Sequence, residues 1–230
     1  MYRLLLTITL LFAATLLGAQ SLTNTDRQTL LAEIATIAEM DGRHRAALSL
    51  GTLDPELLRR DAELSKNGTL EELLAFERSV EETLTDAQRD SLWTLQHRLD
   101  AQNYRAFKRL VQRYGYPSKE RLGVKSDRLF AVLLHPPVEI EPQAFLDEMT
   151  ELLLPEVQAG RMAGKSYALF VDNIKAKVLR EPQLYGTNRS FDLKTMAMGP
   201  PEIVDLEITN AARAAIGLEP LAEAEVRVLR

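Results

Sequence analysis

Apolar residues recur every three or four positions along most of the chain, which is the spacing of one face of an α-helix. In the first such segment, Leu30, Ile34 and Ile37 lie on one line. Gly and Pro residues separate the segments, because neither continues a helix easily. The pattern predicts helices over 22–50, from 55 onward, and over 70–83, 85–114, 129–134, 142–160 and 165–180, with a short last helix capped by Asn210 and ended by Gly217.

Side-chain caps mark where two of these helices begin. Thr69 with Glu72, and Thr85 with Gln88, have the spacing of a capping box, in which two side chains satisfy the free backbone donors of the first turn. The helix that starts after Thr85 is long and ends at Tyr114-Gly115-Tyr116-Pro117, where Gly and Pro stop it.

Prolines and a change of period mark the later part of the chain. Pro155 falls inside a helical segment and predicts a kink or a break, because proline removes a backbone donor. Ser126 is expected to cap the short helix that follows it. Loose alternation over 184–197 and 203–208, around Gly199-Pro200-Pro201, predicts a small hairpin. The expected fold class is therefore mainly α, a bundle-like array of about six to eight helices with a small C-terminal β-hairpin.

The N-terminal residues have the pattern of a secretory signal peptide. Arg3 supplies a short positive region, Leu4 to Leu17 is an apolar run, and Gly18 and Ala19 are small. The run is short for a membrane span, although an uncleaved anchor is the alternative. We expect cleavage after Ala19, export to the periplasm or the exterior, and no stable membrane span after cleavage.

The expected division of the chain follows from this pattern. A signal peptide occupies 1–19, an N-terminal helical layer 20–115 and a C-terminal region 116–230. A chain of this length without the signal peptide can form one sizeable core. We therefore expect the two regions to fold as one compact unit.

Composition narrows the chemistry. The 230 residues include 28 Lys and Arg against 33 Asp and Glu, a net charge of −5, which gives no basic footprint for nucleic acid. The chain has no cysteine, so disulfides, thiolate metal sites and a cysteine nucleophile are excluded. The three histidines leave little material for a zinc site, and no P-loop, GxGxxG, GxSxG or HExxH motif is present. We expect no cofactor and no metal.

Polar residues interrupt the apolar stripes of two helices. Asp41 and Arg45 continue the line of Leu30, Ile34 and Ile37, and their i, i+4 spacing allows them to pair. On the long helix Asn103 interrupts an apolar row, with Asp100 beside it. Burying such groups is costly unless they are hydrogen-bonded or paired.

Two later residues show the same anomaly. Asp172 lies among apolar neighbours on its helix, and His135 ends a run of six apolar residues before two prolines. Several helices thus bring a polar group toward the interior, and we expect these groups to converge. Buried polar groups can fix helix register, and they can also form a functional cluster.

Much of the chain resembles a family of bacterial proteins. The most specific element is Pro182-Gln183-Leu184-Tyr185-Gly186-Thr187. The other matching segments are Tyr114-Gly115-Tyr116-Pro117, Gly123, Leu133-Leu134-His135, Leu153-Leu154-Pro155, Asp172 and Ala215-Ile216-Gly217-Leu218, with Asp41, Arg45, Asp100 and Asn103 upstream. The family is catalogued only as a domain of unknown function and is common in exported or lipid-anchored proteins of Bacteroidetes. The resemblance implies an architecture and a set of residues rather than a reaction.

Some positions depart from the usual pattern of that family. Leu134 precedes His135 where the family has Gln, Asn173 follows Asp172 where it has Arg, and Asn188 stands in place of a final Gln. These departures fall beside the residues that a family site would use.

The polar residues and the family motif support one hypothesis about a site. They line a pocket between the long helices, closed by the turn at 183–188, where Gly186 permits a positive φ. His135 and Asp172 are the candidate catalytic residues. The candidate ligand-binding residues are Asp41, Arg45, Asp100, Asn103, Gln183, Tyr185 and Thr187.

Two classes of function follow from this hypothesis. The first is a cell-envelope binding or structural protein, whose partner is a small polar ligand or an envelope protein. The alternative is a hydrolase-like enzyme in which His135 or Asp172 acts as general base and Arg45 or Tyr185 stabilises negative charge. Whether the protein is an enzyme stays open at this point.

Overall fold

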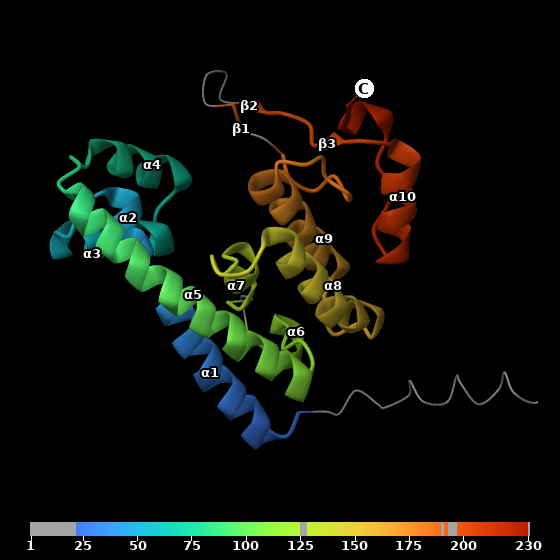
Figure 1. Cartoon of the computed structure of the whole chain (residues 1–230), viewed down its shortest axis with the longest axis horizontal. Helices are drawn as coiled ribbons and strands as arrows, with labels where there is room; N and C mark the ends of the chain where they lie inside the picture. The colour runs from blue at the N-terminus through green and yellow to red at the C-terminus, as the bar shows by residue number, and fades with distance from the viewer. Residues whose placement is uncertain (1–21, 125–127, 190, 193–196, 230) are drawn as a thin grey trace, which may run out of the picture.

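The computed structural model describes residues 22–124, 128–189, 191–192 and 197–229, and it is mainly helical, as predicted (Figure 1). The signal-peptide segment 1–19 and the expected cap Ser126 lie outside the described residues. The helices are α1 (Asn24–Gly42), α2 (Arg45–Leu50), α3 (Pro55–Asn67), α4 (Leu70–Ser79), α5 (Asp86–Tyr114), α6 (Lys119–Leu122), α7 (Phe130–Leu134), α8 (Pro142–Gln158), α9 (Gly164–Asn173) with a π-helical turn Ile174–Leu179, α10 (Leu206–Ala215) and a 3-10 turn Glu223–Glu225.

The core lies between two layers of helices that meet at α7. In Figure 1, α1 runs along the long helix α5, and α8 and α9 pack beside each other on the other side of α7. The short helix α7 contacts α1, α5 and α9. Its Leu133 is fully buried, as are Leu30 of α1, Phe107 of α5, Phe145 of α8 and Phe170 of α9. Burying large side chains of this kind stabilises the fold by about 1.5–3 kcal/mol each.

A lobe of short helices covers one end of α5. It consists of α2, α3 and α4 (Figure 1), and neither α3 nor α4 contains a fully buried residue. Both predicted capping boxes are present: Thr69 accepts from the Glu72 backbone at the start of α4, and Thr85 accepts from Gln88 at the start of α5. Gly115, with φ 69°, ends α5 where predicted.

The single helix predicted over 22–50 is divided in the structure, and a side chain from α5 explains the break. α1 ends at Gly42 and α2 begins at Arg45. The Gln96 side chain accepts from the backbone N–H of His44 at 3.1 Å and donates to the Asp41 carbonyl at 3.0 Å. A continuous helix would use both of these backbone groups internally. Gln96 therefore takes the place of two helical hydrogen bonds.

Of the kink or break expected at Pro155, the break does not occur. α8 continues through Pro155 to Gln158, only three residues further. Because the proline stands in the last turn, the missing donor interrupts little of the hydrogen-bond ladder.

The C-terminal strands only partly follow the prediction. A small antiparallel pair joins β1 (Phe191–Asp192) to β2 (Ala197–Met198), so its connection falls before Gly199-Pro200-Pro201 rather than on it. β3 (Glu202–Ile203) pairs in parallel with the distant β4 (Arg227–Val228).

The last helix begins earlier than expected. Asp205, rather than Asn210, caps α10, and its side chain accepts from the backbone N–H of Ile208. Asn210 instead bonds the backbone N–H and carbonyl of Leu221. Within the described part of the chain, none of these helices is long and apolar enough to cross a membrane.

Candidate functional site

A polar network lies where α1, α2, α5 and α7 meet. Asp41 is in the last turn of α1, Arg45 opens α2, Asp100 lies on α5 and His135 follows the last residue of α7. The two carboxylates and Asn103 are buried, while His135 and Arg45 are partly exposed. The helices thus bring together five of the side chains that interrupt the apolar stripes.

His135 is held on one side of its ring by Asp41. Nδ1 of His135 lies 2.9 Å from Oδ1 of Asp41. Because an ionised carboxylate can only accept, Nδ1 carries the proton of this bond, and in the neutral ring Nε2 is then the acceptor. Nε2 makes no hydrogen bond to any described residue, and 30 % of the His135 side chain is exposed. The ring therefore offers a fixed acceptor at the edge of the network.

Arg45 connects the two buried carboxylates. Its Nη2 donates to Oδ1 of Asp100 at 2.6 Å, and its Nε lies 3.8 Å from Oδ2 of Asp41. The predicted pairing of Asp41 with Arg45 is thus present but long, and the shorter contact is to Asp100. The Arg45 Nε is buried without a hydrogen-bond partner, while 22 % of the side chain is exposed. With a neutral His135, these four residues carry one net negative charge.

Asn103 ties α5 to α1 and leaves one atom unused. Its Nδ2 donates to the Ile37 carbonyl at 3.2 Å. Its Oδ1 is buried without a hydrogen-bond partner, although the residue is only 1 % exposed. An unsatisfied buried acceptor costs about 1–3 kcal/mol. Asn103 therefore holds the helices in register and also retains an unused acceptor.

Asp172 organises a second polar group, around the turn at 183–188. Its two carboxylate oxygens accept from the backbone N–H groups of Leu184, Tyr185 and Thr187 at 2.8–2.9 Å and from the Thr187 hydroxyl at 2.7 Å. The residue is fully buried. Burial raises the pKa of Asp172 above its ordinary value, and the hydrogen bonds from Tyr185, Thr187 and Leu184 oppose that rise. Four donors thus already occupy this carboxylate.

The same turn is closed by two further residues. The Gln183 side chain donates to the Asn188 carbonyl and accepts from the Asn188 N–H, both at 2.7 Å. Gly186 has φ 63°, the positive value expected from the sequence. Tyr185 is buried against Tyr167, and burial together with that neighbour raises the pKa of the Tyr185 hydroxyl. The turn is therefore a closed hydrogen-bonded unit.

The structure sorts the candidate residues into two groups. Asp41, Arg45, Asp100, Asn103 and His135 gather at the junction of α1, α2, α5 and α7, whereas Asp172, Gln183, Tyr185 and Thr187 gather around the turn after α9. Among the described residues, no hydrogen bond or ion pair joins the groups. The predicted roles in binding and catalysis stay predictions, and the geometry offers the first group, with its partly exposed His135 and Arg45, as the more accessible one.

Gln96, which no sequence pattern singled out, completes the first network. Gln96 is fully buried, and its Nε2 donates to Oδ1 of Asp100 at 2.9 Å as well as to the Asp41 carbonyl. Its position four residues before Asp100 places both side chains on one face of α5, and this spacing was the available signal.

An ion pair between the buried Glu156 and the partly exposed Arg161, which the sequence patterns also did not indicate, holds the turn that ends α5. Glu156 of α8 accepts from Arg161 at 2.5 and 2.6 Å and from the Tyr116 backbone N–H at 2.7 Å. Burial opposes ionisation of Glu156, but the hydrogen bonds from Arg161 and Tyr116 outweigh it, so its pKa is lowered. Arg121 donates to the carbonyls of Tyr114 and Tyr116. The Tyr114-Gly115-Tyr116-Pro117 motif thus has a structural explanation.

The fold and the site define a mainly α-helical protein with a buried polar network opening at His135 and Arg45. Residues 68–230 match the Family of unknown function (DUF6624), and the chain belongs to this family. The match includes His135, Asp172 and the turn at 183–188, whereas Asp41 and Arg45 lie before it. No curated protein and no solved structure matches the chain. In the described ranges, no group of three or more His, Asp or Glu residues is placed to hold a metal ion.

Proposed function

We propose that this protein is an exported cell-envelope protein that binds a small polar ligand at the junction of α1, α2, α5 and α7. The observation that carries the proposal is the geometry of His135. Asp41 fixes Nδ1 at 2.9 Å, and Nε2 stays without a partner among the described residues at the partly exposed side of the ring. A ligand that donates a hydrogen bond to Nε2 completes this arrangement.

The charge of the network supports a ligand that donates rather than accepts at His135. Asp41 and Asp100 together outweigh Arg45, so a donor group meets a slightly negative surrounding. The buried Arg45 Nε and Asn103 Oδ1 have no hydrogen-bond partner, which costs stability in the free protein. A network that served stability alone would be expected to satisfy these atoms.

A hydrolase-like enzyme is the second candidate, and the same histidine favours it. A carboxylate on Nδ1 with a free Nε2 is the arrangement that orients a general base. No Ser or Thr hydroxyl of the described residues hydrogen-bonds His135, so a nucleophile would have to be a water molecule or part of the substrate. Asp172 does not support this candidate, because four donors already occupy its carboxylate.

The proposal is tested by the small molecules that accompany the purified protein. The wild-type protein, His135→Gln and the matched control His97→Gln are prepared in parallel, and mass spectrometry identifies what each releases on denaturation. His97 stacks on Trp93 on α5 and takes no part in the network. We expect one polar molecule in the wild type and the control that is absent from His135→Gln.

Two other outcomes of this experiment have clear meanings. Identical extracts from all three proteins would overturn the binding proposal. Conversion of the molecule during incubation with the wild type, but not with His135→Gln, would move the assignment to the hydrolase.

Export is tested separately. The apolar run of 1–19 and the resemblance to exported proteins support removal of this segment. The mass of the protein recovered outside the cytoplasm should correspond to a chain that starts at Gln20. A full-length mass in the cytoplasmic fraction would contradict export.

A further inference from the structure

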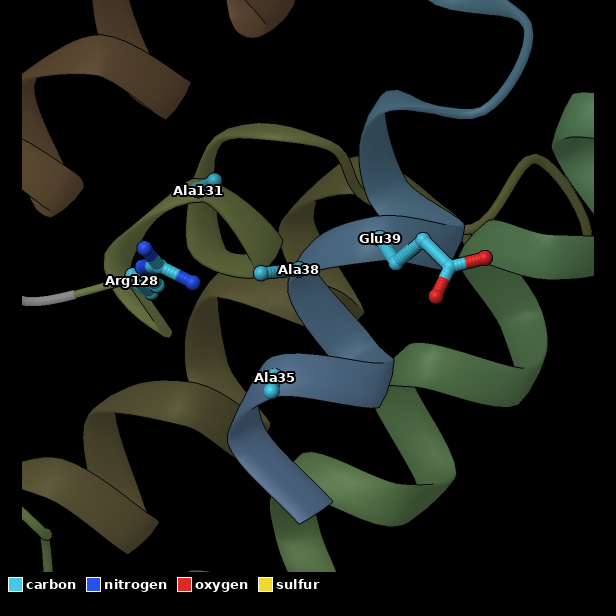
Figure 2. A pocket seen from close by; sticks show the side chains of 5 residues that line it. All are labelled: Ala35, Ala38, Glu39, Arg128 and Ala131. Atoms are coloured by element: carbon cyan, nitrogen blue, oxygen red, sulfur yellow. The ribbon is translucent and has the colours of Figure 1, made fainter. Parts of the chain in front are cut away.

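A hollow of about 580 Å³ lies between α1 and the start of α7. Ala35, Ala38 and Glu39 line it from α1, and Arg128 and Ala131 line it from the other side (Figure 2). A volume of this size is within the range of sites for small molecules. Three of the five lining residues are alanines, so much of the surface of the hollow carries no large side chain.

The hollow lies beside the His135 site along both of the segments that form it. Ala131 stands four residues before His135, and Ala38 stands three residues before Asp41. Ala38 and Asp41 are thus about one turn apart on α1, and His135 directly follows the last residue of α7, the helix that contains Ala131. The contact between His135 and Asp41 therefore lies about one turn beyond the hollow on α1 and just past the end of α7.

The hollow contains one cation without a partner. Among the described residues, Arg128 makes no hydrogen bond and no ion pair, and its side chain is exposed. Figure 2 shows the Glu39 carboxylate pointing away from Arg128, and Glu39 is paired with Arg43 at 2.8 Å. The acidic residue of the hollow thus leaves the Arg128 guanidinium free for an anion from outside.

The surrounding charge selects the kind of anion. Glu39 lines the hollow, Asp41 and Asp100 belong to the neighbouring polar network, and the chain as a whole carries −5. A phosphate group close to −2 is repelled more strongly by these groups than a carboxylate of −1. A guanidinium binds a carboxylate through two parallel hydrogen bonds.

Resting on the proposed function, we infer that the ligand is an extended molecule of small width, with a terminal carboxylate at Arg128 and a hydrogen-bond donor at His135. Arg128 and His135 flank α7 (Phe130–Leu134), and the seven residue steps between them correspond to a span on the order of 10 Å. Three extended residues of a peptide span about the same distance. A short peptide with small side chains and a free C-terminal carboxylate fits the alanine-lined surface of the hollow, the cation and the histidine together.

The test compares trialanine that has a free carboxylate with trialanine amide, by isothermal titration at low ionic strength. Wild-type protein is expected to bind the acid about fivefold to tenfold more tightly than the amide, in line with about 1 kcal/mol for an exposed charged pair. Arg128→Gln should remove this preference and leave binding of the amide unchanged. The matched control Arg109→Gln, an exposed arginine on α5, should keep it.

His135→Gln separates this inference from the proposed function. It should weaken binding of the acid and of the amide equally, because neither peptide then meets the Nε2 acceptor. Absence of peptide binding, or equal binding of acid and amide, overturns the inference and leaves the His135 site to its own test. If Arg128→Gln removes the preference while His135→Gln changes nothing, the link between hollow and histidine fails and the proposed function loses its support.

Discussion

Asp172 is predicted to be a structural anchor, and its removal gives the clearest energetic test of that assignment. Asp172→Ala deletes the acceptor of three backbone N–H groups and of the Thr187 hydroxyl. A lost hydrogen bond costs about 1 kcal/mol, and a buried donor left unpaired costs more. The substitution leaves one buried and two partly buried backbone donors without an acceptor, so we expect the free energy of unfolding to fall by about 3–5 kcal/mol.

The assay is urea unfolding at pH 7, because a lower midpoint at an unchanged slope reports a change in stability. Asp172→Asn keeps one acceptor oxygen, so its loss should fall between the wild type and Asp172→Ala. Asp90→Ala on the exposed face of α5 serves as the control and should change stability by less than about 0.5 kcal/mol. A loss below about 1 kcal/mol for Asp172→Ala would refute the anchor and return Asp172 to the list of candidate catalytic residues.

Three further predictions concern groups outside the proposed ligand site. The pKa of Glu156 is lower in the native state than in the unfolded chain, so ionised Glu156 stabilises the fold. The stability advantage of the wild type over Glu156→Gln, followed by urea midpoints, should be complete above pH 4.5 and decline as the pH falls through the lowered native pKa. An advantage independent of pH would contradict this. Gln96→Ala should lower the free energy of unfolding by about 1–3 kcal/mol, and a neutral result in the same assay would exclude Gln96 as the cause of the helix break. Gly186→Ala should lower the stability measured by thermal unfolding by about 1–2 kcal/mol, because the position has a positive φ and the added methyl group would lie 2.8 Å from Leu221. The control Gly42→Ala, where no atom lies within 4 Å of the added methyl group, should lose no stability. Equal effects of the two substitutions would contradict backbone strain at Gly186.

Local patterns predicted much of the helical framework. The capping boxes at Thr69 and Thr85 depend only on residues three apart, so the sequence contained everything needed to place those helix starts. The convergence of Asp41, Asp100 and His135 was also predictable, because a polar residue on an apolar stripe faces the interior.

Features that depend on distant partners were not predictable in the same way. The break between α1 and α2 requires Gln96, more than fifty residues away, to capture backbone groups of Asp41 and His44. The parallel pairing of β3 with β4 joins short segments that carry no periodic signal. The separation of Asp172 from His135 arises because the turn after α9 folds back onto its own helix, so the single pocket expected from the motif divides into two groups.

The proposed ligand site depends on which ring nitrogen of His135 carries the proton, and nitrogen-15 NMR at pH 8 measures this. We predict a proton on Nδ1, from which Asp41 accepts a hydrogen bond, and an unprotonated Nε2. Asp41→Ala should release this tautomer, which identifies the carboxylate as its cause. A proton on Nε2 in the wild type would overturn the proposed ligand site, because His135 would then offer a ligand no acceptor.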